Sequence, residues 1–209
     1  MARNRSARFD TPTLDELVLA HSLFEEREPR DLFYRIATWL MDPATRVSHP
    51  FGRTDALAAL LQTWNRGYYQ RQRIPFDAAH YAAIDGLLER HDGQLAAFGA
   101  RTIASLRADD EPAVRSLFAH FTRVLGPTGA SKALHLLAPR FFPLWDSEIA
   151  ARGYHLYQRD DIDYWLLLEA VRDQSAAVGG EQGLGGNPVK AVDEYNYCRY
   201  TLNEAALRS

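Results

Sequence analysis

The chain has 209 residues and a formal net charge of −3, and 46% of its residues are hydrophobic, a composition typical of a soluble globular protein. This balance gives no overall positive field toward nucleic acid or membrane, and no apolar run approaches the ~20 residues that span a bilayer. A single cysteine excludes an internal disulfide and a cysteine-ligated zinc or iron–sulfur centre. We therefore expect a cytoplasmic monomer that does not bind membranes.

The first half of the chain carries apolar residues at helical spacing. Thr13 and Glu16 form a capping box, in which each side chain accepts a hydrogen bond from a free backbone N–H at a helix start. The helix that follows is predicted to bury Leu14, Leu17 and Val18, and a second helix from Pro29 to bury Leu32, Phe33, Ile36 and Leu40. Further helices are predicted over 54–69, 77–90, 94–106 and 110–124.

The second half continues the same pattern, with helices predicted up to 137, after Asp146, around 161–173 and over 189–206. Residues 178–188 contain five glycines, which favours a flexible loop. We find no alternating strand pattern and no internal repeat. The sequence therefore predicts one all-α domain over residues 1–209.

The segment with the most chemical information is 125–149, which reads LGPTGASKALHLLAPRFFPLWDSEI. Residues 126–129 predict a tight turn between two helices, and the whole helix–turn–helix segment covers about 113–138. The glycines of the turn let the backbone approach a bulky partner. The free N–H groups at the start of the second helix, with Lys132 in its first turn, suit a phosphate oxygen. Only two of the 24 basic residues are lysines, Lys132 and Lys190, so the position of Lys132 is informative.

This segment resembles the helix-hairpin-helix of the DNA glycosylase superfamily that includes the endonuclease III-like, adenine-specific and 8-oxoguanine enzymes. The family hairpin reads roughly Leu-Pro-Gly-Val-Gly, and residues 125–129 match it with the central Gly and Pro exchanged. The family then places an essential aspartate after a Pro-containing loop, which residues 142–147 match with Asp146. The resemblance covers about 25 residues. It implies an enzyme that binds double-stranded DNA, flips a damaged or modified base and hydrolyses its N-glycosidic bond, leaving an abasic site.

Asp146 is the predicted catalytic residue. Cleavage of an N-glycosidic bond develops positive charge on the sugar, and a carboxylate beside C1′ stabilises that charge. A helix start keeps such a carboxylate ionised. The alternative is that Asp146 only caps its helix.

Lys132 lies one residue away from the position that, by the family resemblance, distinguishes bifunctional from monofunctional enzymes. Aligned by the hairpin, the family position of the Schiff-base lysine in bifunctional enzymes falls on Ser131. One residue on a helix is a rotation of ~100°, so we favour a monofunctional enzyme with Lys132 near the DNA backbone. The alternatives are a bifunctional glycosylase/lyase that uses Lys132 as nucleophile, and a non-catalytic module that only binds DNA. The predicted DNA-backbone contacts are Gly126, Thr128, Gly129, Ser131 and Lys132.

A flipped base needs stacking surfaces and hydrogen-bonding groups, and the amide of Asn65 could read a base edge. The predicted base pocket comprises Trp64, Asn65, Tyr68, Trp145, Tyr154 and Tyr157, each with a place in the core or on a helix surface as its alternative. We interpret His135 as a packing residue. Arg66, Arg71 and Arg73 form a basic cluster that a solvated helix face explains and that could also contact phosphates.

No cofactor or metal is expected, although a monovalent cation could bind at the hairpin. The sequence does not identify the base. The missing iron–sulfur cysteines and the divergent hairpin leave both DNA repair and the excision of hypermodified phage bases in antiviral defence as hypotheses.

Overall fold

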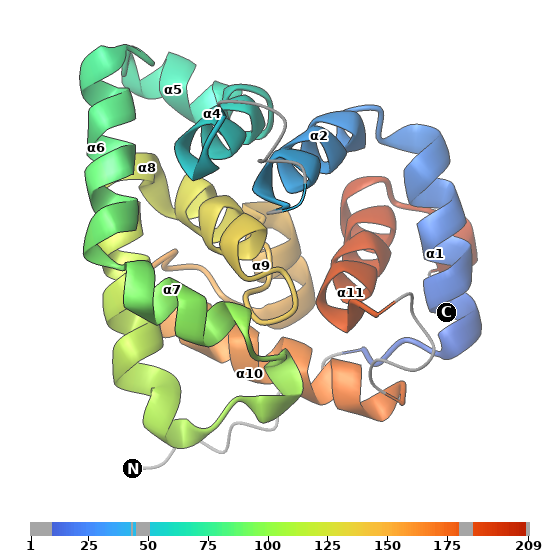
Figure 1. The fold of residues 1–209 in the computed structure, drawn as a ribbon. Helices are drawn as coiled ribbons and strands as arrows, with labels where there is room; N and C mark the ends of the chain where they lie inside the picture. The colour runs from blue at the N-terminus through green and yellow to red at the C-terminus, as the bar shows by residue number, and fades with distance from the viewer. Residues whose placement is uncertain (1–9, 43, 45–50, 180–185, 208–209) are drawn as a thin grey trace.

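The computed structural model describes residues 10–42, 44, 51–179 and 186–207, and over these residues it is all-α, as the helical periodicity predicts. Its helices are α1 (Leu14–Arg27), α2 (Asp31–Met41), α4 (Arg53–Trp64), α5 (Arg66–Gln72), α6 (Ala78–Arg90), α7 (Asp92–Gly99), α8 (Glu111–Leu137), α9 (Ser147–Tyr154), α10 (Asp161–Ala177) and α11 (Pro188–Asn196) (Figure 1). None of these helices is long and apolar enough to cross a bilayer. Most of the predicted glycine-rich loop, residues 180–185, lies outside the described residues.

The N-terminus of α1 confirms the predicted capping box. The Glu16 N–H donates to the Thr13 hydroxyl at 3.2 Å, and the Thr13 N–H donates to the Glu16 carboxylate at 2.7 Å. The predicted apolar face is only partly right, because Leu17 is buried whereas Leu14 and Val18 are 45% and 56% exposed.

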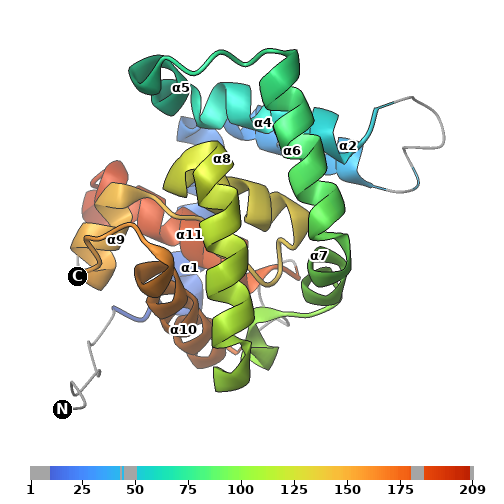
Figure 2. The same ribbon diagram turned by 90° about the vertical axis from the view of Figure 1, so that its left-hand side faces the viewer.

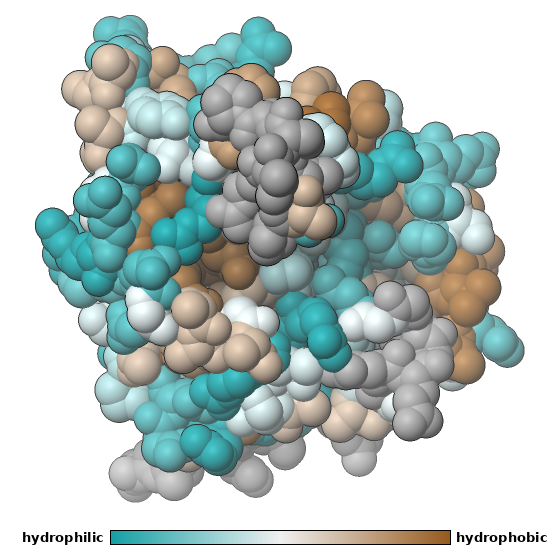
Figure 3. Space-filling view, viewed as in Figure 1, coloured by the Kyte–Doolittle hydropathy of each residue, from teal (hydrophilic) through white to brown (hydrophobic). Residues whose placement is uncertain are grey.

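The predicted buried face of α2 is wrong for three of its four residues. Leu32, Phe33 and Ile36 are exposed, whereas Leu40 is partly buried against the core. Helix α2 instead buries Tyr34 and Ala37 as it packs along α4. A small alanine lets two helices approach closely, and this tertiary contact overrides the apolar pattern of the isolated helix. In Figure 3, apolar side chains accordingly gather on the surface over α1 and α2.

The core is built around α8, which α4, α6, α7 and α10 contact (Figures 1 and 2). Its first half buries Leu117, Phe118 and Phe121, and the Phe118 ring stacks on that of Tyr164 with centroids 4.0 Å apart. Burial of each such side chain contributes about 1.5–3 kcal/mol to folding. This core fixes the position of the second half of α8, which carries Lys132.

Helix α8 changes direction at Gly126, as Figure 2 shows. Gly126 has φ 71° and ψ 165°, and it is the only residue between Glu111 and Leu137 with non-helical angles. Glycine adopts a positive φ without steric cost, and Pro127 suits the first turn of the helix that follows. The predicted four-residue turn is therefore reduced to one residue.

The two ends of the described chain pack together, with α1 beside α11 (Figure 1). Phe24 of α1 and Tyr195 of α11 belong to one small apolar cluster that also contains the single cysteine, Cys198. A hydrogen bond of 2.8 Å joins His21 Nδ1 and Glu194 Oε2 across the same contact. This pairing brings C-terminal residues to the cavity described next.

Candidate functional site

A cavity of about 100 Å³ lies where α1, α4, α8, α9 and α11 meet, and it has room for several water molecules or a small planar group. Its walls combine aromatic, acidic and basic side chains. They are Phe24, Glu28, Arg30, Trp64, Lys132, Leu144, Trp145, Asp146, Ile149, Asp193 and Tyr197. The two predicted catalytic residues, Lys132 and Asp146, therefore line one cavity.

Ser131 and Lys132 are neighbours in the second half of α8, but their side chains have different surroundings. Ser131 is fully buried, and its hydroxyl accepts from the Trp145 N–H at 2.9 Å and donates to the Thr128 carbonyl at 3.0 Å. Lys132, about 100° further around the helix, enters the cavity and donates to the backbone carbonyl of Trp64. The rotation that argued against a role for Lys132 thus directs it toward Asp146 and Ser131 toward the core.

The environment of Lys132 makes its ammonium group easier to deprotonate. Burial is the main cause and the nearby Arg30 guanidinium acts in the same direction, and the pKa of Lys132 is lowered to about 8. The carboxylates of Asp146, Asp193 and Glu28 act in the opposite direction but do not outweigh burial. A lysine with a pKa near 8 has a substantial fraction of nucleophilic amine at neutral pH.

Asp146 both caps α9 and lines the cavity. Its Oδ1 atom accepts from the backbone N–H of Glu148 at 2.8 Å and from that of Ile149 at 3.2 Å. The predicted cap is thereby confirmed, and the same carboxylate faces the cavity. The two alternatives for this residue are compatible, because a cap uses one carboxylate oxygen.

Asp193 is a second carboxyl in the cavity, contributed by α11. Burial raises the pKa of Asp193 to about 7. The ammonium groups of Lys190 and Lys132 act against this rise, whereas Glu194 and Asp146 add to it. The cavity thus contains an amine and a carboxyl group that both titrate near neutral pH.

Two tryptophans form walls of the cavity, as the sequence predicted for Trp64 and Trp145. Trp64 ends α4, and its ring stacks on that of Tyr34 with an interplanar angle of 19° while its Nε1–H donates to the Arg30 carbonyl at 2.8 Å. Trp145 is 1% exposed, and its Nε1–H has no hydrogen-bond partner among the described residues. Flat aromatic surfaces of this kind suit a planar ligand.

A polar cluster of Glu28, Arg30 and Tyr197 lies at one side of the cavity. The Glu28 carboxylate accepts from the Arg30 guanidinium and from the Tyr197 hydroxyl. Burial acts to raise the pKa of Glu28, but these hydrogen bonds outweigh it and lower the pKa to about 2. The Arg30 side chain is 56% exposed and carries positive charge at the cavity entrance.

The other predicted base-pocket residues lie outside this cavity, which corrects the prediction for them. Asn65 is buried and donates to the Leu125 carbonyl at 3.1 Å, and Tyr68 packs against Gly126. Tyr154 is buried between Gln174 and Asn196 with its hydroxyl hydrogen-bonded to both, and Tyr157 is 63% exposed beyond the C-terminus of α9. Asn65, Tyr68 and Tyr154 therefore contribute to packing and hydrogen bonding inside the protein instead.

The predicted DNA-backbone contacts also need correction. A Cβ on Gly126 would lie 2.4 Å from the Tyr68 ring, and one on Gly129 would lie 2.5 Å from the Asn65 amide. The missing Cβ atoms of the two glycines therefore leave room for the Tyr68 and Asn65 side chains of the protein itself. Gly126, Gly129 and Ser131 are all buried. Of the predicted set only Thr128 is partly exposed outside the cavity.

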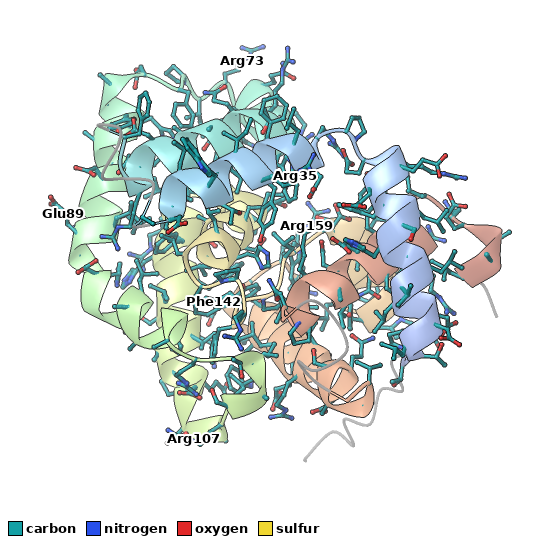
Figure 4. The ribbon with its side chains drawn as sticks, turned by 45° about the vertical axis from the view of Figure 1, so that its right-hand side comes forward. Arg35, Arg73, Glu89, Arg107, Phe142 and Arg159 are labelled. Carbon is teal, nitrogen blue, oxygen red and sulfur yellow. The ribbon has the colours of Figure 1, made fainter. Side chains whose placement is uncertain are left out.

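His135 is confirmed as a packing residue: its Nδ1–H donates to the Phe142 carbonyl at 2.8 Å, and its Nε2 accepts from the Tyr34 hydroxyl at 2.9 Å. Figure 4 shows Phe142 within the body of the molecule.

The predicted basic cluster lies on the surface. Arg66, Arg71 and Arg73 are all exposed, and Figure 4 shows Arg73 at the outer edge of the molecule.

The described residues contain no group of three His, Cys, Asp or Glu side chains that could hold a metal ion.

Sequence reasoning missed four further polar cavity residues: Glu28, Arg30, Asp193 and Tyr197. The one signal that could have pointed to any of them is the acidic pair Asp193-Glu194 in the closing helix. Such a pair is ordinary on a solvated face. Its burial follows from the packing of α11 beside α1, which the local pattern does not encode.

No family model matches the chain, and comparisons with curated proteins and with solved structures find no significant match either.

Proposed function

We propose that the protein is a DNA glycosylase that cleaves the N-glycosidic bond of a flipped base within the cavity of Lys132 and Asp146. The observation that carries the proposal is that these two residues, 14 positions apart, line one small cavity walled by Trp64 and Trp145. The family resemblance of residues 125–149 supports it independently of the cavity.

Asp146 is the proposed electrostatic partner of the sugar. As the bond to the base lengthens, C1′ becomes positively charged, and a fixed carboxylate stabilises that charge without reorganisation. Two backbone N–H groups hold Asp146 Oδ1 in place, which pre-organises the carboxylate. The exposed arginines Arg30, Arg66, Arg71 and Arg73 are available for phosphate contacts.

The variant Asp146→Asn tests this role. Asparagine is as good an N-cap as aspartate, so α9 should persist while the charge disappears. We expect base release from a panel of modified duplexes and phage DNAs, read by mass spectrometry, to fall about 10²–10³-fold.

The matched control is Glu148→Gln, which removes the same charge from an exposed residue two positions away and should leave release unchanged. An Asp146→Asn protein as fast as the wild type on every substrate would overturn the proposed mechanism. Salt-dependent DNA binding with no base release by the wild type would instead indicate a non-catalytic binding module.

A bifunctional glycosylase/lyase is the second candidate, and the position of Lys132 inside the cavity favours it over the monofunctional enzyme. The neutral Lys132 amine would attack C1′, and the base would leave with the bonding electrons and take up a proton. Opening of the sugar ring then forms a protonated Schiff base. Borohydride should trap this adduct in the wild type and not in Lys132→Met.

The substrate range remains open between damaged bases and hypermodified phage bases. The same panel separates them, because release confined to phage DNA supports an antiviral role and release from oxidised, alkylated or deaminated bases supports repair.

A further inference from the structure

We propose that Asp193 is the general acid of the cavity and works with Lys132 as a pair that exchanges one proton. This inference rests on the lyase form of the proposed function. It assigns a catalytic role to α11, a helix that the family resemblance does not cover.

The geometry places three reactive groups in one small volume. Lys132 comes from the second half of α8, Asp146 from the start of α9 and Asp193 from α11, and all three line the same cavity. Behind Asp193 lies a second, smaller cavity with apolar walls that include Val189 and Val192 of α11. Asp193 therefore lies between an apolar cavity and the cavity that Lys132 lines, and the charges of the two groups interact.

The charges around Asp193 come from three elements. Lys190 and Glu194 lie on its own helix, Lys132 on α8 and Asp146 at the start of α9. Two cations and two carboxylates nearly balance, so burial determines the preferred form of Asp193 and favours the neutral acid.

The two aspartates consequently have different tasks. Asp146 accepts two backbone hydrogen bonds at a helix start, which fix the position of its carboxyl group. Asp193 has a pKa of about 7 and Lys132 a pKa of about 8, so little free energy separates the ion pair from the neutral amine with the neutral acid. Pairs of groups whose environments set their pKa values apart are typical of acid–base catalysis.

An abasic site is a probe that requires no knowledge of the base. The Lys132 amine attacks the aldehyde carbon at C1′, and the amine proton moves to the carbonyl oxygen, giving a carbinolamine. Asp193 then donates its proton to the hydroxyl group, water leaves, and the nitrogen lone pair forms the C=N bond of a protonated Schiff base. The net change is one amine, one aldehyde and one proton converted to one iminium and one water.

The experiment measures the rate of adduct formation between the full-length protein and an abasic-site duplex with cyanoborohydride, from pH 5.5 to 9.5. Because the reactive state combines a neutral amine with a neutral acid, we expect a bell-shaped wild-type profile centred between pH 7 and 8. Asp193→Asn should lower the maximum about 100-fold and remove the alkaline decline, since only Lys132 then titrates.

Asp193→Glu, which retains an acid, should restore the alkaline limb even if Asp193→Asn folds poorly. Asp173→Asn, an exposed carboxylate of α10, is the matched control and should preserve the wild-type profile. A bell-shaped profile in Asp193→Asn would overturn the inference. So would the absence of any wild-type adduct, but base release observed without an adduct would leave the proposed glycosylase function intact.

Discussion

The two lysines of the chain lie near the same tryptophan, and their surroundings differ. The Nζ atoms of Lys132 and Lys190 are 5.8 and 6.0 Å from the centroid of the Trp64 ring. Lys190 Nζ is paired with Glu194 at 3.1 Å and Asp31 at 3.6 Å, and it lies 4.0 Å from the centroid of the Phe24 ring. Lys132 instead donates to the neutral carbonyl of Trp64.

This difference indicates that pairing, rather than burial alone, decides what a buried lysine does. Lys190 joins α2 to α11 through ion pairs with two carboxylates. Burial penalises the charged form of Lys132, which lowers its pKa and makes the neutral amine more accessible than in an ordinary lysine. We therefore assign a structural role to Lys190 and propose the chemical role for Lys132.

Breaking the paired lysine should have the largest effect on stability. Lys190→Met removes the buried cation that Asp31 and Glu194 share and leaves them only the more exposed Arg35 and His21, so we expect the free energy of unfolding in urea at pH 7 to fall by about 2–4 kcal/mol. Arg35→Met removes an exposed cation 3.7 Å from Asp31 and should cost less than about 0.5 kcal/mol. Equal losses in the two variants would contradict the structural role of Lys190.

Asp193→Asn should stabilise the protein while it impairs chemistry. The pKa of Asp193 rises from its ordinary value of 3.8 to about 7 in the folded state, so the folded state binds more protons between these values and wild-type stability falls as pH rises from 4 to 7. Asparagine removes this penalty, and we expect a gain of about 2–4 kcal/mol at pH 8 that disappears near pH 4. Urea unfolding at both pH values measures it, and a gain of equal size at pH 4 would refute the explanation.

Among the three variants at buried charged residues, Lys132→Met has the smallest expected change in stability. It tests whether Lys132 differs from Lys190 in its contribution to folding. The pKa of Lys132 falls from 10.5 to about 8 on folding, so the unfolded state binds more protons between these values. Wild-type stability should therefore rise from pH 8 to pH 10.5, and the variant should lack this rise. At pH 7 we expect the variant to gain about 1–3 kcal/mol in urea unfolding. A loss like that of Lys190→Met would show that both lysines are structural.

Local chemistry made part of the molecule predictable. The Thr13–Glu16 capping box and the Asp146 cap depend on residues within three positions, and the structure confirms both. The short link between α8 and α9 also keeps Asp146 near the second half of α8, which carries Lys132. These features depend on residues close in the sequence, whereas the arrival of Trp64 from α4 in the same cavity does not.

The predictions fail where a residue far away in the sequence determines the surroundings of a side chain. Gly126 and Gly129 were interpreted as space for DNA, and the space is occupied by Tyr68 and Asn65, about 60 residues earlier in the chain. The helix of Asp193 has no motif, and only its packing against α1 and α10 brings Asp193 to the cavity. A local pattern records neither contact.

The packing of α1 against α11 has a consequence for folding. The cavity draws its walls from residues as early as Phe24 and as late as Tyr197, so it forms only when segments far apart in the sequence meet. Contacts between such distant segments cost more loop-closure entropy than contacts between neighbouring helices. The Lys132 amine therefore acquires its full surroundings only once this long-range contact has formed.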